Sequence, residues 1–153
     1  MSLRDRINEG LKEAMKARDA ARTSTLRLIS AAMRDRDIAA RGEGSSAEGI
    51  GEAEILALLG KMVRQRQESA KIYEEGGRLE LAAKEIAEIA IIEEYLPRQL
   101  TAAETEAAIA GVIAETGATG IRDMGRVMAA LKEKYTGALD FSTVGAAVKA
   151  KLM

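Results

Sequence analysis

The stretch KEIAEIAIIEEYLP, residues 84–97, decides how the rest of the chain is organised. It contains four isoleucines, Ile86, Ile89, Ile91 and Ile92. At 100° per residue these face nearly every direction around a helix, which is typical of a helix covered on several sides. A β-branched run also occurs in buried strands, but the length and the interleaved alanines and glutamates favour a helix from Arg78 to Leu96. Pro97, the only proline, lacks an amide hydrogen and is expected to end this helix, which divides the chain into an N-terminal domain, residues 1–96, and a C-terminal domain, residues 97–153.

Upstream of this stretch, apolar residues recur at helical spacing in three further segments. The first runs from Ser2 to about Ala17 and opens with a capping serine that is followed three positions later by an acidic residue. The second follows Asp19 and reaches about Ala40, and the third spans Glu52 to Glu75. Between them, Gly42 to Gly51 holds four glycines, two serines and two glutamates, a composition that predicts a mobile loop without packing of its own.

One charged residue falls inside the apolar face of the third segment. At 100° per residue, Arg66 projects from the middle of the arc that carries Ile55, Leu59, Met62, Val63, Ala70 and Tyr73. Because an unpaired charge in such a place is costly, Arg66 is predicted to reach solvent or to pair with a carboxylate, for which the next helix is the expected source.

After Pro97 the pattern predicts three short helices. Thr101 followed by Glu104 is a capping box for the first, which ends at Gly117. The second carries the apolar stripe Ile121, Met124, Val127, Met128 and Leu131, and the third carries Val144, Ala147, Val148 and Leu152. The sequence therefore predicts an all-α fold, with an N-terminal helical part of about four helices followed by a small three-helix C-terminal bundle.

The composition excludes most common enzyme mechanisms. With no cysteine and no histidine, the chain has no thiolate ligand and lacks the usual side chain for proton transfer near neutral pH. We therefore expect no catalytic residue, no metal site and no cofactor. No stretch approaches the roughly 18 apolar residues of a membrane span, and the N-terminus is charged where a signal peptide is apolar. These features predict a cytoplasmic protein that does not bind membranes.

Charge is segregated along the chain although the net charge is only -1. Residues 1–41 carry ten basic against six acidic side chains, and residues 79–96 carry one against five. Residues 119–153 carry three acidic side chains against six basic ones, Arg122, Arg126, Lys132, Lys134, Lys149 and Lys151. On charge alone this set is either a solvated helical surface or a phosphate-binding patch. Because aromatic residues are too few for base stacking, RNA binding would rest on phosphate contacts and would weaken strongly with salt.

Four short segments carry a family resemblance. YLPRQL (residues 95–100) and DMGRVM (residues 123–128) resemble the signature of the GatB/YqeY family. LKEAMK (residues 11–16) and TLRLI (residues 25–29) resemble the start of its stand-alone YqeY proteins. The resemblance covers essentially the whole chain and implies an all-α fold. It also implies that the C-terminal domain is similar to the tail of the B subunit of glutamine-dependent tRNA amidotransferase.

In that enzyme the tail helps to hold misacylated tRNA, and the catalytic steps belong to parts that have no counterpart here. The resemblance therefore implies a non-catalytic module that binds tRNA or another RNA, with an amidotransferase or another translation-related protein as its partner. The family's label, a carbon–nitrogen ligase with glutamine as amido donor, derives from the whole complex. The resemblance places the tRNA contact on Arg122 and Arg126, flanked by the four lysines. The alternative is a protein-interaction adaptor that binds no RNA, which the segregated charge favours.

Overall fold

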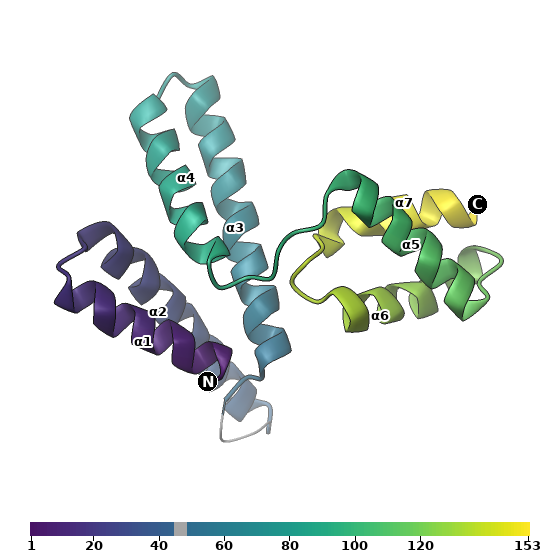
Figure 1. Ribbon diagram of the computed structural model, residues 1–153, viewed down its shortest axis with the longest axis horizontal. Coiled ribbons are helices and arrows are strands. Elements are labelled where there is room, and N and C mark those ends of the chain that lie inside the picture. Colours follow the sequence, from purple (N-terminus) through teal and green to yellow (C-terminus); the bar gives the residue numbers. More distant parts are fainter. Residues whose placement is uncertain (45–48) are drawn as a thin grey trace. The chain divides into compact units, whose positions relative to one another are not determined.

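The computed structural model describes residues 1–44 and 49–153, and over these residues it is helical with no strand (Figure 1). The predicted all-α fold is therefore confirmed. The backbone divides into two compact units, Met1–Leu96 and Pro97–Met153. Each unit has a hydrophobic core of its own.

The first unit is built from two helical hairpins. Its helices are α1 (Leu3–Lys16), α2 (Ala20–Gly42), α3 (Glu52–Glu75) and α4 (Leu79–Glu93). Figure 1 shows α1 lying along α2 and α3 lying along α4. The core between the hairpins contains, among others, Ile7, Leu26, Ile29, Leu59 and Ile92, all without solvent exposure. As predicted, the Ser2 hydroxyl accepts a hydrogen bond from the backbone N–H of Asp5 (3.1 Å), which completes a capping box for α1.

Helix α4 ends at Glu93, earlier than the predicted end at Leu96. The backbone tightens instead, because the N–H of Tyr95 donates to the carbonyl of Ile92 (3.0 Å) and that of Leu96 to the carbonyl of Glu93 (3.1 Å). These turns carry Tyr95 into the core, where it is 8% exposed. The prediction that the helix continues to Leu96, next to Pro97, is therefore wrong, because the helix ends three residues earlier.

The four isoleucines of α4 are not all covered. Ile89 and Ile92 are buried and Ile91 is partly buried, but Ile86 is 51% exposed. Helix α4 packs against α3 and α2, and neither of them covers Ile86. The prediction of a helix covered on several sides is therefore wrong for Ile86, since hydrophobic periodicity indicates a direction and does not show that a neighbour lies there.

The predicted loop Gly42 to Gly51 is partly anchored. Gly42 is the last residue of α2, and residues 45–48 lie outside the described residues. Ile50 is 7% exposed, its N–H donates to Asp37 Oδ1 (2.9 Å), and its carbonyl accepts from Arg4 Nη2 (3.2 Å). The prediction of a segment without packing is therefore wrong for Ile50, because an ion pair from α1 and α2 supplies partners for its backbone.

The second unit contains α5 (Ala102–Thr116), a short 3₁₀ turn η1 (Ile121–Asp123), α6 (Met124–Tyr135) and α7 (Phe141–Leu152). The predicted capping box of α5 is present, with the N–H of Glu104 donating to the Thr101 hydroxyl (3.1 Å). The core contains Ile109, Val112, Val127, Leu131, Leu139, Val144, Val148 and Leu152. Ile121, predicted on the apolar stripe of the second helix, is instead 48% exposed, because the 3₁₀ turn breaks the helical spacing before α6 begins.

Gly10 in α1 allows a close approach of the buried Tyr95 side chain. A Cβ at Gly10 would overlap the Tyr95 hydroxyl and lie 3.3 Å from its Cζ atom. We therefore predict that Gly10→Ala lowers the free energy of unfolding by about 1–2 kcal/mol, because overpacking outweighs the better helix propensity of alanine. Urea unfolding measures this effect.

The matched control for Gly10 is Gly60 in α3, where an added Cβ would meet only Arg64 Nη1 at 3.8 Å. Gly60→Ala should stabilise by up to about 1 kcal/mol through helix propensity. In a Tyr95→Phe background, which lacks the hydroxyl, Gly10→Ala should lower the free energy of unfolding much less. An equal cost in both backgrounds would show that Tyr95 is not the obstacle.

Candidate nucleic-acid interface

All six predicted RNA-binding residues lie on the surface of the second unit. Arg122 is in η1, three residues are in α6 and two are in α7, and every one of these side chains is exposed: Arg122, Arg126, Lys132, Lys134, Lys149 and Lys151. Exposure makes each of them accessible to a phosphate group. Their ion pairing and their directions around the helices differ.

Two of the six are engaged in ion pairs. Arg126 Nη2 lies 3.1 Å from Asp123 Oδ1, one turn away, and Lys134 Nζ lies 2.9 Å from Glu115 Oε1 on α5. The Asp123 carboxylate also accepts the backbone N–H groups of Thr119 (2.9 Å) and Gly120 (3.3 Å). These backbone hydrogen bonds, with the nearby arginines, hold the pKa of Asp123 below its usual range. Arg126 therefore belongs to a local turn, and its charge is partly neutralised there.

The other four cations, Arg122, Lys132, Lys149 and Lys151, form no ion pair with any residue that the structure describes. On α7, Lys149 and Lys151 are two positions apart and so point about 200° from each other. They flank the buried stripe formed by Val144 and Val148 on opposite sides. Lys132 and Lys134 on α6 are also two positions apart and point about 200° from each other. The six residues therefore do not share one helix face.

A groove between the end of α1 and the start of α2 was not among the predicted sites. It has a volume of about 650 Å³ and is lined by Met15, Arg18, Ala20, Thr23, Ser24, Arg27 and Leu28. Arg18 and Arg27 are exposed, and neither forms an ion pair with a described residue. The available sequence signal is the seven-residue spacing of Arg27, Arg34 and Arg41 along α2, which by itself indicates only a basic outer face.

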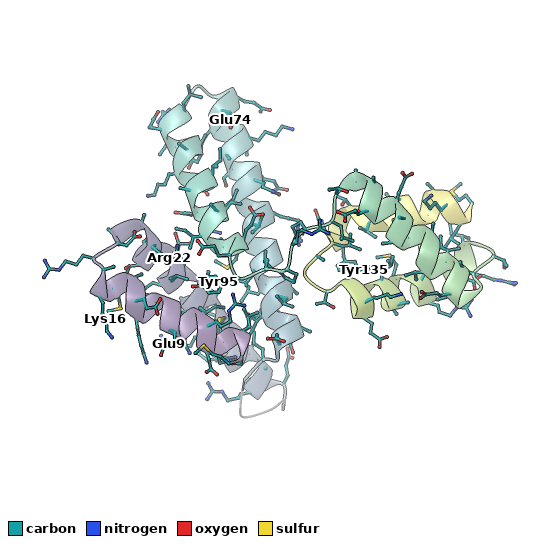
Figure 2. The ribbon with its side chains drawn as sticks, in the orientation of Figure 1. Glu9, Lys16, Arg22, Glu74, Tyr95 and Tyr135 are labelled. Atoms are coloured by element: carbon teal, nitrogen blue, oxygen red, sulfur yellow. The ribbon has the colours of Figure 1, made fainter. Side chains whose placement is uncertain are left out.

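A second hollow, of about 340 Å³, lies between α1 and the turn that follows α4, and its lining includes Arg6, Glu9, Glu94 and Tyr95. Figure 2 labels Glu9 and Tyr95, which line the hollow, and Arg22 of α2, which does not line it but pairs with Glu94. Arg6, which lines the hollow, and Arg22, which pairs with the lining residue Glu94, each have a partner. The Arg6 guanidinium lies 5.5 Å from the centroid of the Tyr95 ring, and Arg22 donates twice to the Glu94 carboxylate, at 2.9 and 2.6 Å.

The hydrogen bonds to Arg22 lower the pKa of Glu94, and those to Glu94 raise the pKa of Arg22. The Arg22–Glu94 ion pair therefore joins α2 to the turn that follows α4 and so helps to hold the two hairpins together.

The residues that the structure describes contain no cluster of three or more acidic side chains placed to hold a metal ion. Over the same residues, no helix is both long and apolar enough to cross a bilayer.

Comparison with known proteins gives two matches. A family model described as "Yqey-like protein" matches residues 4–152. The curated protein "Altered inheritance of mitochondria protein 41, mitochondrial" from Lachancea thermotolerans is 30% identical over 100 residues, which is 65% of this chain and 51% of that protein. The chain therefore spans about half the length of this curated relative. The family model, in contrast, accounts for nearly the whole chain.

Proposed function

The chain belongs to the YqeY-like protein family, and from that premise we propose that it is a non-catalytic RNA-binding module whose ligand is tRNA. The observation that carries the proposal is the set of four exposed cations on the second unit that have no ion pair among the described residues: Arg122, Lys132, Lys149 and Lys151. An exposed cation without a carboxylate partner is available to a phosphate at little desolvation cost.

This chemistry gives shape-dependent and charge-dependent binding. Tyr135 and Phe141 are half-buried and pack against the core of the second unit, so they do not form a stacking platform for bases. Binding through lysine and arginine alone releases counterions from the RNA backbone. The affinity should therefore fall steeply with salt and depend little on base sequence.

The proposal includes association with tRNA-dependent amidotransferase function, as the resemblance to the amidotransferase tail implies. In such an assembly this chain would hold tRNA, and the amide-forming chemistry would belong to other subunits. We propose the cytoplasm as its compartment on the strength of the sequence alone.

Titration of tRNA against salt tests the proposal. We expect binding at low ionic strength, and we expect the double variant Lys132→Ala, Lys149→Ala to bind more weakly. The slope of log affinity against log salt concentration should become shallower by about 0.7–0.9 for each phosphate that the variant no longer neutralises. Lys84→Ala is the control, because that lysine is exposed on α4 of the first unit, lies outside the set of second-unit cations and should change binding little. No binding of wild-type protein even at low salt would overturn the proposal.

A further inference from the structure

Helix α1 ends in an unusual way, with an arginine where the backbone favours glycine. The N–H of Arg18 donates to the carbonyl of Met15 (3.2 Å), and that of Asp19 donates to the carbonyl of Ala14 (3.0 Å). This pair of hydrogen bonds defines a Schellman motif, whose penultimate residue adopts the left-handed conformation. Arg18 has φ 57° and occupies that position.

The other helix ends of this kind use glycine. At the ends of α3 and α5, Gly77 (φ 74°) and Gly117 (φ 68°) occupy the same position and form the same pair of hydrogen bonds. Across residues 1–44 and 49–153, Arg18 is the one residue other than glycine with a positive φ. A Cβ in this conformation contacts the following carbonyl, so glycine would be more stable here. Folding therefore does not explain the arginine side chain.

Arg18 lines the groove between α1 and α2 together with Arg27. The groove also presents the Thr23 and Ser24 hydroxyls, which are donors that commonly contact phosphate. Met15 and Leu28, 49% and 46% exposed, give the groove apolar surface against which a sugar can pack. The polar lining therefore consists of two guanidinium groups and two hydroxyls, with no carboxylate.

Beyond the groove the positive charge continues along α2. Arg27, Arg34 and Arg41 are all exposed and follow one another at intervals of seven residues. Each therefore points only about 20° away from the one before it around the helix axis. With a rise of 1.5 Å per residue they extend over about 21 Å. Arg41 is close enough to Asp37 to lower the pKa of that carboxyl, so Arg27 and Arg34 are the freer charges. A single small anion would occupy only one end of this row.

We propose that the α1–α2 groove and the arginine row of α2 bind the phosphate backbone of RNA, with Arg18 and Arg27 holding one phosphate and Arg34 another. The inference rests on the proposed function and adds to it a contact surface on the first unit. A repeating polyanion matches both the length of the row and the donors in the groove.

The variant Arg18→Gly separates binding from folding. It removes the Cβ that is strained in the left-handed conformation, so we expect the melting temperature to rise by about 3 °C. It also removes the guanidinium group. The affinity for tRNA at low salt should fall about fivefold, because the variant cannot form the charge-assisted hydrogen bond to phosphate. Arg18→Lys should retain most of the binding. Arg78→Ala is the control, since Arg78 is an exposed arginine at the start of α4 that does not line the groove.

The outcomes distinguish the groove proposal from the proposed function. If wild-type protein binds tRNA and the Lys132→Ala, Lys149→Ala variant is weakened, but Arg18→Gly binds normally, the groove proposal is wrong and the proposed function stands. If wild-type protein does not bind tRNA, both fail. If poly-glutamate at equal charge displaces tRNA from wild type but not from Arg18→Gly, the groove takes acidic peptide, which also overturns the inference.

Discussion

Replacing Arg66 by methionine is expected to lower the free energy of unfolding of the first unit by about 3 kcal/mol. Arg66 Nε lies 2.8 Å from Glu88 Oε2 on α4, and Arg66 Nη1 donates to the carbonyl of Met62 (3.1 Å). The two charged side chains are only 14% and 17% exposed. Removing the guanidinium leaves the Glu88 carboxylate poorly solvated and without a cation, which is costlier than losing an exposed pair. Urea unfolding followed by circular dichroism measures the effect.

The double variant Arg66→Met, Glu88→Met shows whether the loss of stability arises from the unpaired Glu88 carboxylate. Apolar side chains of similar size should fill the space, so the double variant should recover most of the lost stability. The control is Lys134→Met, in the exposed Lys134–Glu115 pair of the second unit, which should leave the unfolding midpoint unchanged within error. If the double variant is as unstable as Arg66→Met, packing rather than charge carries the effect.

Local signals in the sequence are sufficient to predict most of the fold. The Ser2 and Thr101 caps and the limits of α3, Glu52 to Glu75, follow from residues within one or two turns of each other, and the structure has them as predicted. Arg66 is also predictable, because a charge on an apolar arc requires a partner and the next helix offers Glu88. In each case the deciding contact lies close in the sequence or follows from helical spacing.

Features that depend on distant partners are not predictable in this way. The Ile50 carbonyl accepts from Arg4, which lies 46 residues away in the sequence, and the exposure of Ile86 depends on which neighbours cover α4. The pairing of Arg126 with Asp123 is local, yet the sequence leaves open whether that arginine faces RNA or a carboxylate. The left-handed conformation of Arg18 is not predictable from the sequence for another reason. Helix ends of this kind are usually recognised by a glycine, and α1 ends without one.

The second large effect is expected at Asp37, where a single carboxylate joins α1, α2 and the segment that leads into α3. Asp37 Oδ1 and Oδ2 each accept from the Arg4 guanidinium at 2.9 Å, and Oδ1 also accepts from the N–H of Ile50 (2.9 Å). The Asp37 side chain is 16% exposed. Asp37→Ala should lower the free energy of unfolding by about 3 kcal/mol, because the Arg4 guanidinium loses its carboxylate and the Ile50 N–H loses its acceptor. Asp35→Ala, at an exposed aspartate of the same helix, should change it by no more than about 0.5 kcal/mol.

The contribution of Asp37 should also depend on pH in a defined direction. The hydrogen bonds from Arg4, and then the one from Ile50, hold the pKa of Asp37 below its usual value near 4. A lowered folded-state pKa stabilises the fold fully above the unfolded-state pKa, and this stabilisation is lost as the pH falls through the folded-state pKa. The stability difference between wild type and Asp37→Asn should therefore be constant from about pH 7 to 5 and shrink below about pH 4, while the other carboxylates cancel in the comparison. A difference that stays constant down to about pH 2 would mean that the Asp37 charge does not provide the stabilisation.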